Sequence, residues 1–246
     1  MAMSTQRRRW LACAAGWLAA TALGGGMRSA SAKVPAQANN LILTLEKGQG
    51  LSHVIESITP VAPSGSAAGS ASAIYDVVGD LRIQFRFIAV PPEAKVRPAE
   101  IRDATFAELR ALGLQPEQAV RKALANMARL WVLPPTAARL IEAARSKGRL
   151  HSGGIVDTIV IAVLPLVGGS WMMDRSLWTE ATEALGPIVV TAARQGVAYA
   201  PLRDVKAMEW MEANHENNVR VGFALSNQLY IFEKRRWAVF AKQAAR

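Results

Sequence analysis

Cysteine is almost missing from this chain: a single residue, Cys13, occurs among 246. Histidine is scarce as well, with three residues, and aromatic side chains make up 7%. Charged residues reach 20% against 51% apolar residues, and this balance excludes an intrinsically disordered polymer, a collagen and a disulfide-stapled miniprotein. A lone cysteine cannot form an intramolecular disulfide, and Cys13 lies in a segment that we expect to be removed. Sites built on thiolates are therefore excluded too.

A targeting segment is expected over residues 1–32. Arginines occupy positions 7–9, an uncharged stretch runs from 10 to 27, and Ala-Ser-Ala stands at 30–32. This order is typical of a secretory signal peptide cleaved after Ala32. The paired arginines followed by Trp10 also resemble the leader of the twin-arginine pathway, which exports folded proteins, although Gln6 replaces the usual hydroxyl residue. We expect a periplasmic or otherwise exported protein, by either the general secretory or the twin-arginine route. The alternative is an uncleaved membrane anchor on a tethered accessory protein.

Removal of residues 1–32 leaves 214 residues with a formal charge of +6. A chain of this length buries roughly 70% of its unfolded surface, which is enough for a core without covalent cross-links. Residues 33–72 are predicted to form an N-terminal arm with a flexible loop, because 60–72 are rich in proline, glycine and serine. Residues 73–246 are predicted to form one domain.

Hydrophobic periodicity predicts both helices and strands in that domain. Residues 81–87 alternate strictly between apolar and polar side chains, as in a half-buried strand. Further strands are expected at 41–45, 155–167 and 170–173, with hairpins over 188–200 and 228–240, and a short helix or turn at 51–58. Helices are expected over 103–112, 116–131, 136–146, 174–185 and 204–215, the last ended by Asn217-Asn218. The pattern favours an α+β fold with a mixed, largely antiparallel sheet and helices packed on one face.

Several short segments between Leu81 and Phe232 resemble the YtpQ-like family of uncharacterised bacterial proteins. Besides the alternating strand at 81–87, the matching segments are Leu-Gly-Leu-Gln-Pro-Glu at 112–117, Ala-Leu-Ala-Asn-Met at 123–127, Ser-Trp-Met-Met-Asp at 170–174 with Leu-Trp at 177–178, Ile-Val-Val at 188–190, Ala-Pro-Leu-Arg-Asp at 200–204 and Leu-Ser-Asn-Gln-Leu-Tyr at 225–230. Members of that family typically have no export leader, and this chain departs from them there. The resemblance implies a fold of this kind and no established activity.

Motifs for catalysis and for metal binding are absent from the sequence. There is no HExxH pair, no phosphate-cradling glycine loop and no GxSxG elbow. Glu212 and His215 are spaced to share one helical face, but no further ligand is indicated, so a solvated helix face is our interpretation. We assign no catalytic residue, no metal and no cofactor.

Basic side chains are concentrated in residues 121–150. This segment has a local charge of +6, whereas 33–120 carries −1 and 151–246 carries +1. Such a concentration attracts anionic surfaces over about 8 Å at physiological salt. The expected partner is an anionic envelope component or an acidic protein. Nucleic acid is disfavoured, because Trp131 is the one aromatic residue there; ordinary solvated helix faces are the alternative. The candidate residues are Arg121, Lys122, Arg129, Arg139, Arg145, Lys147 and Arg149.

A second set of residues could line a groove. Trp171 and Trp178 flank Asp174, and Arg203 and Asp204 follow the hairpin that ends at residue 200. Packing in the core is the alternative for the tryptophans. The sequence therefore favours a non-enzymatic, exported binding module with a basic helical face. The alternative is a hydrolase-like enzyme with a site near Asp174, Arg203 and Asp204.

Overall fold

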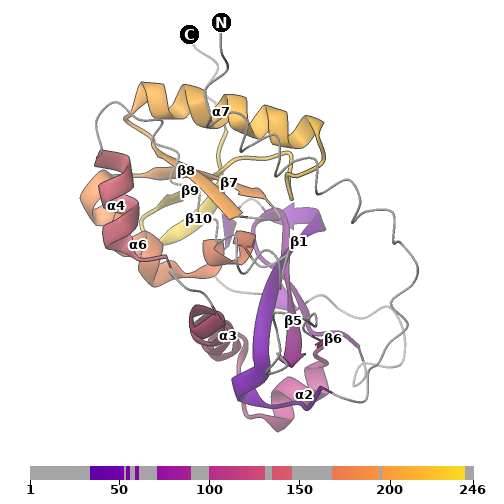
Figure 1. The fold of residues 1–246 in the computed structure, drawn as a ribbon. Coiled ribbons are helices and arrows are strands. Elements are labelled where there is room, and N and C mark those ends of the chain that lie inside the picture. Colours follow the sequence, from indigo (N-terminus) through magenta and orange to yellow (C-terminus); the bar gives the residue numbers. More distant parts are fainter. Residues whose placement is uncertain are drawn as a thin grey trace, which may run out of the picture. The chain divides into compact units, whose positions relative to one another are not determined.

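The computed structural model describes residues 34–52, 54–55, 59–60, 71–89, 100–130, 135–145, 168–193 and 196–241. The chain divides into two units, residues 1–32 and 33–246, and the elements below all belong to the second. This unit is an α+β body with five α-helices and two antiparallel sheets among its described residues (Figure 1). The predicted α+β class is thereby confirmed. The predicted strand over residues 155–167 and nearly all of the loop at 60–72 lie outside the described residues.

The first sheet is built around β5 (Gly79–Ala89). β5 pairs with β1 (Leu41–Ser52) on one side, and with β4 (Ile74–Asp76) and β6 (Glu100–Asp103) on the other; β4 also pairs with β3 (Thr59–Pro60). Leu81, Ile83, Phe85 and Phe87 of β5 are all buried, which confirms the predicted strand and its apolar face. β1 contributes Leu41 to Leu45 to the same core, so these residues are an integral part of the body.

The second sheet has the strand order β2-β10-β9-β7-β8. The predicted hairpins are present, as β7 (Ile188–Ala193) with β8 (Gly196–Pro201), and β9 (Tyr230–Glu233) with β10 (Arg236–Val239). Lys234 and Arg235 connect β9 to β10 with φ of 49° and 62°, as a two-residue hairpin turn requires. The helix or turn predicted at 51–58 is wrong: β1 runs to Ser52, and β2 (Val54–Ile55) pairs with β10. A strand of two residues is too short to show an alternation of apolar and polar side chains, so its conformation is determined by pairing with β10.

Helices cover both faces of the second sheet (Figure 1). On one face, Val189 and Ile231 pack against Met208 and Met211 of α7 (Val205–Arg220). On the other face, Val190, Tyr199 and Phe232 join the main core together with α6 (Arg175–Leu185) and the 3-10 helix η2 (Gly168–Met173). α4 (Ala137–Arg145) packs against α6. The strands thus form two sheets, and the second is enclosed on both sides.

Helix boundaries follow their capping residues. α2 (Phe106–Ala111) begins with a capping box in which Thr105 and Glu108 bond reciprocally, and Gly113 follows its end with φ of 69°. The predicted start at Asp103 is wrong, because Asp103 belongs to β6. The predicted end of α7 at Asn217-Asn218 is also wrong: the helix continues to Arg220, and Gly222 follows with φ of 74°. α3 (Pro116–Leu130) begins at its proline, as predicted.

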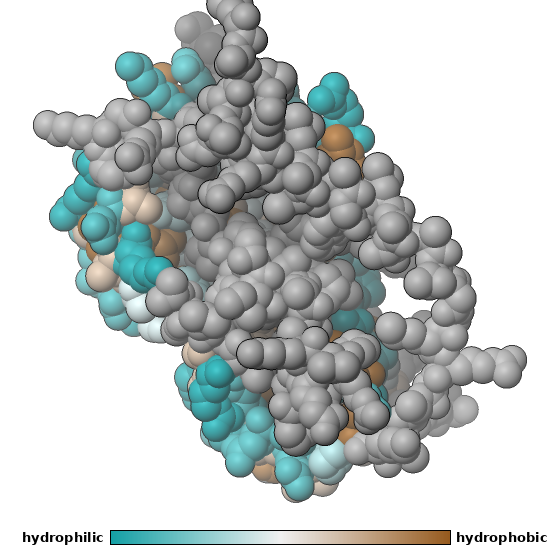
Figure 2. Space-filling model, in the orientation of Figure 1, coloured by the Kyte–Doolittle hydropathy of each residue, from teal (hydrophilic) through white to brown (hydrophobic). Residues whose placement is uncertain are grey.

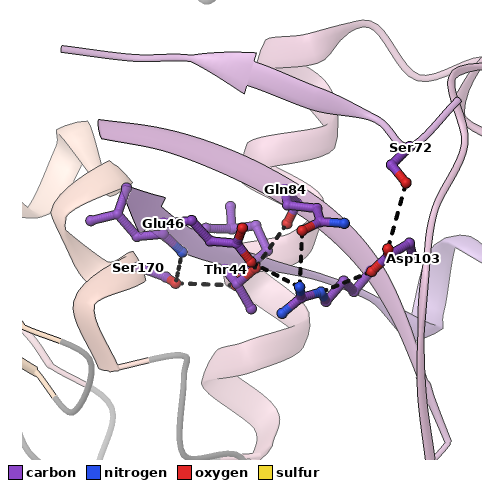
Figure 3. Close-up of polar contacts among 9 residues, drawn as sticks. Thr44, Glu46, Ser72, Gln84, Asp103 and Ser170 are labelled. Carbon is purple, nitrogen blue, oxygen red and sulfur yellow. Dashed lines mark hydrogen bonds and ion pairs between the residues drawn. The ribbon is translucent and has the colours of Figure 1, made fainter. Parts of the chain in front are cut away.

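Side chains form hydrogen bonds with the backbone groups at the free edge of β1. The Ser170 hydroxyl accepts from the Leu45 amide and donates to the Leu43 carbonyl, each at 3.1 Å, while Asn126 Nδ2 of α3 donates to the Leu41 carbonyl at 2.7 Å (Figure 3 shows Ser170). Ser170 lies in η2, where a strand over 170–173 was predicted; that prediction is wrong. A strand edge without partners would leave buried polar groups unpaired, so these side chains take the place of a neighbouring strand.

Candidate functional site

α3 places a row of basic side chains in solvent. Arg121 and Arg129, eight residues apart, are exposed on one side of the helix, and Lys122 is half-buried. The opposite side buries Ala123 and Met127 against β1. Arg129 donates to Asn126 Oδ1, which leaves most of its guanidinium free to meet solvent. An apolar face buried on the strand therefore fixes which side of α3 carries the positive charge.

α4 carries a second, weaker basic row. Arg139 and Arg145 are exposed, but exposed Glu142 lies between them and offsets part of their charge. The helix is held from its other side, where the Leu140 carbonyl accepts from the Tyr199 hydroxyl at 2.8 Å. α3 contacts β1 while α4 contacts α6, so the two rows rest on different elements. Lys147 and Arg149 lie outside the described residues.

Hydrophilic residues dominate the described surface along the left and lower edges of Figure 2, where Figure 1 places α4, α3 and α2. The polar faces of these helices are thus turned outward, as their sequence pattern requires. Within the described residues, no helix is both long enough and apolar enough to cross a membrane.

The tryptophans predicted for a groove are buried in the core. Trp178 is 0% exposed and makes edge-to-face contacts with Tyr199 and Trp237, at centroid distances of 5.9 and 5.5 Å. Its indole N–H donates to the Trp171 carbonyl at 3.0 Å, and Trp171 is itself 2% exposed. The alternative interpretation, core packing, therefore describes both residues.

The two aspartates of that predicted groove begin helices. Asp174 Oδ1 accepts from the Leu177 amide at 3.2 Å at the start of α6, and Asp204 Oδ1 accepts from the Ala207 amide at 3.0 Å at the start of α7. Arg203 is exposed beside Asp204. Both carboxylates satisfy helix N-termini, which accounts for their positions without catalysis.

A polar network that the sequence did not reveal lies across the first sheet (Figure 3). Arg86 of β5 reaches Glu46 of β1 at 2.8 Å and Asp103 of β6 at 3.1 Å, and it also donates to Gln84 at 2.9 Å. Alternation in β5 indicated that Gln84 and Arg86 share a face, but the acidic partners come from other strands. The carboxylates are about one third and one half exposed, so this network ties three strands together with modest stabilisation.

A second polar cluster joins β5 to the segment leading into β9. Asp80 Oδ1 accepts from the Tyr230 hydroxyl at 2.5 Å and from the Ser226 hydroxyl, and the two hydroxyls lie 2.7 Å apart. Burial raises the pKa of Tyr230, and the hydrogen bond to Asp80 raises it further. Ser226 and Tyr230 are fully buried, so this cluster holds the two sheets together rather than facing a ligand.

His215 is a core residue and not part of a wet helix face. It is 7% exposed, and its Nδ1 lies 2.7 Å from Oγ1 of the buried Thr191 on β7. The predicted solvated face is therefore wrong for His215, because α7 turns this residue toward the sheet. Among the described residues, no group of three histidine, cysteine, aspartate or glutamate side chains could hold a metal ion.

The described body is thus an α+β protein with two antiparallel sheets, whose candidate site is the exposed basic rows of α3 and α4. No protein-family model, curated protein or solved structure matches the chain. The resemblance to the YtpQ-like family stays a prediction from the residues that carry it.

Proposed function

We propose that this chain is exported behind a cleaved signal peptide and binds an anionic surface of the cell envelope through the basic rows of α3 and α4. The observation that carries the proposal is the exposure of Arg121 and Arg129 on a helix whose opposite face is buried. Guanidinium groups stay charged at every physiological pH and match phosphate or carboxylate oxygens with paired donors.

α3 is expected to contribute more than α4. The one acidic residue of α3, Glu117, lies in the first turn of the helix, about one turn before Arg121 and about three turns before Arg129. In α4, Glu142 lies midway between Arg139 and Arg145. α3 therefore carries a net charge of +2 and α4 a net charge of +1, so an anionic partner is expected to be attracted more strongly by α3.

The test measures binding of residues 33–246 to vesicles with and without anionic lipid. Each arginine near an anionic membrane contributes about 1 kcal/mol, so Arg121→Gln with Arg129→Gln should weaken binding about 30-fold at low salt. Arg139→Gln with Arg145→Gln should weaken it less. High salt should weaken wild-type binding and shrink both differences, because the interaction is screened.

The matched control removes the same charge from α7, as Lys206→Gln with Arg220→Gln, both of which are exposed. Thermal melting of every variant checks that the body remains folded. If the control pair weakens binding as much as the α3 pair, net charge and not this site is responsible. Equal binding to neutral and anionic vesicles at all salt concentrations would refute the proposal outright.

The second hypothesis from the sequence, a hydrolase-like site near Asp174, Arg203 and Asp204, gains no support from this geometry. Both carboxylates are already engaged as helix caps, and the neighbouring tryptophans are buried. We therefore propose the binding function alone.

A further inference from the structure

Among the described residues, Arg129 is the member of the α3 basic row that a hydrogen bond ties to the body. Its Nη2 donates to Oδ1 of Asn126, three residues earlier in the helix. Within the same part of the chain, no hydrogen bond or ion pair holds Arg121, which is exposed eight residues before Arg129. Side chains on a helix lean toward its N-terminus, and this bond fixes how far Arg129 leans. The guanidinium therefore stays beside the turn that contains Asn126.

Asn126 is a rigid support, because all of its polar groups are engaged. Its Nδ2 donates to the Ala38 and Leu41 carbonyls, each at 2.7 Å, and the residue is 4% exposed. An asparagine amide has two N–H donors and one carbonyl oxygen. The backbone uses both donors and the oxygen accepts from Arg129, so turning the amide over would lose all three hydrogen bonds. The side-chain orientation of Asn126 is thereby determined.

The carbonyls that hold Asn126 belong to a fixed part of the body. Ala38 lies in the 3-10 helix η1 (Ala38–Asn40), which contacts α3. Leu41 begins β1, pairs with Phe87 of β5 and is 0% exposed. A continuous set of contacts thus leads from the first sheet through Asn126 to one exposed guanidinium and gives that group a defined position.

Ala125 leaves space for a small anion beside this guanidinium. It is exposed, and it lies four residues before Arg129 on the same side of α3. Its side chain ends at one methyl group, so a compact anion can approach Arg129 there. An arginine has five N–H donors, and among the described residues the bond to Asn126 uses one of them. Paired donors therefore remain for two oxygens of one phosphate group.

We propose that Arg129 binds the phosphate group of an anionic lipid beside Ala125, and that Asn126 is the positioning residue that holds the guanidinium for it. Attraction by the whole α3 row needs charge alone, whereas this site needs the planar guanidinium and its orientation. A side chain that is fixed before binding loses less entropy when the ligand arrives, so Arg129 contributes more than Arg121. The inference rests on the function proposed above and names the chemical group that the α3 row binds.

The first test exchanges arginine for lysine, which keeps the charge and removes the planar fork. Binding is measured on vesicles with phosphatidylglycerol, whose one anionic group is a phosphate. The protein is residues 33–246, which contain every residue of the two described hydrophobic clusters. Arg129→Lys should weaken binding about fivefold, and Arg121→Lys by less than about twofold. Equal effects of the two lysine substitutions would overturn the inference.

A double-mutant cycle tests the role of Asn126. Asn126→Ala should weaken binding about fivefold in the wild type and by less than about twofold when residue 129 is already lysine, because positioning acts through Arg129 alone. Ser170→Ala is the matched control, since it also removes buried hydrogen bonds to β1 but makes no contact with Arg129, and it should leave binding unchanged. Thermal melting checks that every variant is folded at the assay temperature. An effect of Asn126→Ala in both backgrounds, or in neither, would contradict the positioning role.

The place of the phosphate group is tested by adding a carboxylate. Ala125→Glu puts it four residues before Arg129, where it can pair with the guanidinium and occupy the site. Gln118→Glu adds the same charge at an exposed position of the same helix, eleven residues before Arg129. The charge alone should weaken binding about fivefold in Gln118→Glu, and Ala125→Glu should reach about 25-fold because it also blocks the fork. Equal losses would show that the anion does not lie beside Arg129.

Failure of this inference is distinguishable from failure of the proposed function. If Arg121→Gln with Arg129→Gln weakens binding but both lysine substitutions leave it unchanged, α3 acts by charge alone; the proposed function then stands and the fixed site is refuted. If the glutamine pair has no effect, both fall. A loss from the glutamine pair beyond the roughly 30-fold that charge accounts for, together with a weakened Arg129→Lys variant, supports the fixed site.

Discussion

Replacing Ser170 with alanine removes one oxygen atom from the contact between η2 and the edge of β1. The Ser170 side chain is completely buried, and its hydroxyl pairs with the Leu45 amide and the Leu43 carbonyl, both also buried. The deletion therefore leaves one donor and one acceptor without partners. A buried polar group that loses its hydrogen bond costs about 1–3 kcal/mol, so Ser170→Ala should lower the free energy of unfolding by about 2–4 kcal/mol.

Urea unfolding of residues 33–246, followed by tryptophan fluorescence, measures this change. The space vacated by one hydroxyl is too small for a water molecule to take over both bonds, so no rescue by solvent is expected. Ser176→Ala is the control, because Ser176 is exposed and its hydroxyl donates to the exposed end of the Asp174 side chain; it should change stability by less than about 0.5 kcal/mol. Hydrogen exchange at the Leu45 amide should accelerate in Ser170→Ala alone. A loss no larger than that of Ser176→Ala would refute the role given to this hydroxyl.

Three further predictions concern the joints between strands. Gly79→Ala should lower the free energy of unfolding by at least about 2 kcal/mol in urea, because φ is +56° and the new Cβ would lie 2.3 Å from Gln228 Oε1 and 3.0 Å from both Tyr230 Cε1 and Val239 Cγ2. Gly113→Ala, with φ of +69° and open space, should lower it by only about 1 kcal/mol, and equal losses would contradict the clash. Burial raises the pKa of Tyr75, Tyr199 and Tyr230, which are all the tyrosines of the chain, so the folded state holds them protonated. The stability that this protonation contributes is complete below about pH 10 and is lost as the pH rises beyond it. Tyr199 and Tyr230, whose pKa values are raised most, should therefore ionise only together with unfolding, and phenolate absorbance from all three tyrosines of a folded chain at pH 10 would contradict this. Arg86→Gln should lower the free energy of unfolding by about 1–2 kcal/mol, because Glu46 and Asp103 lose their shared partner. This loss should be smaller in high salt. A loss that does not depend on salt would show that the substitution removes packing and not charge.

Features that depend on neighbours in the sequence were predictable. The alternation in β5 produced its buried apolar face, and Asp174 and Asp204 begin helices at the predicted positions. Both hairpins were predictable as well, because each needs only two short apolar runs and a turn. These elements are determined within about ten residues, where propensity and periodicity act.

Features that depend on distant partners were not predictable. Ser170 bonds to residues 125 and 127 positions earlier in the chain, and no local pattern distinguishes its 3-10 helix from a strand. The same holds for β2, whose partner β10 is the last strand that the structure describes. The division into two sheets follows from such pairings and so could not be read from periodicity.

The same distinction between local and distant determinants applies to the candidate site. Exposure of Arg121, Arg129, Arg139 and Arg145 followed from helical periodicity, because their helices bury the opposite side. The burial of Trp178 did not, since its contacts with Tyr199 and Trp237 bring together three separate segments. The partners of Arg86 and Asp80 were missed for that reason too. A signal for them did exist: each is a charged residue next to a buried apolar residue of the same strand.

The pairing of β2 with β10 has a consequence for the way this protein is made. Ile55 lies opposite Trp237, 182 residues later in the chain, so β2 stays unmatched until β10 has been synthesised. During that interval β2 has no partner in its sheet, and contacts of such long sequence separation form slowly. A chain that stops before Trp237 would leave β2 without its partner and the second sheet open at that edge.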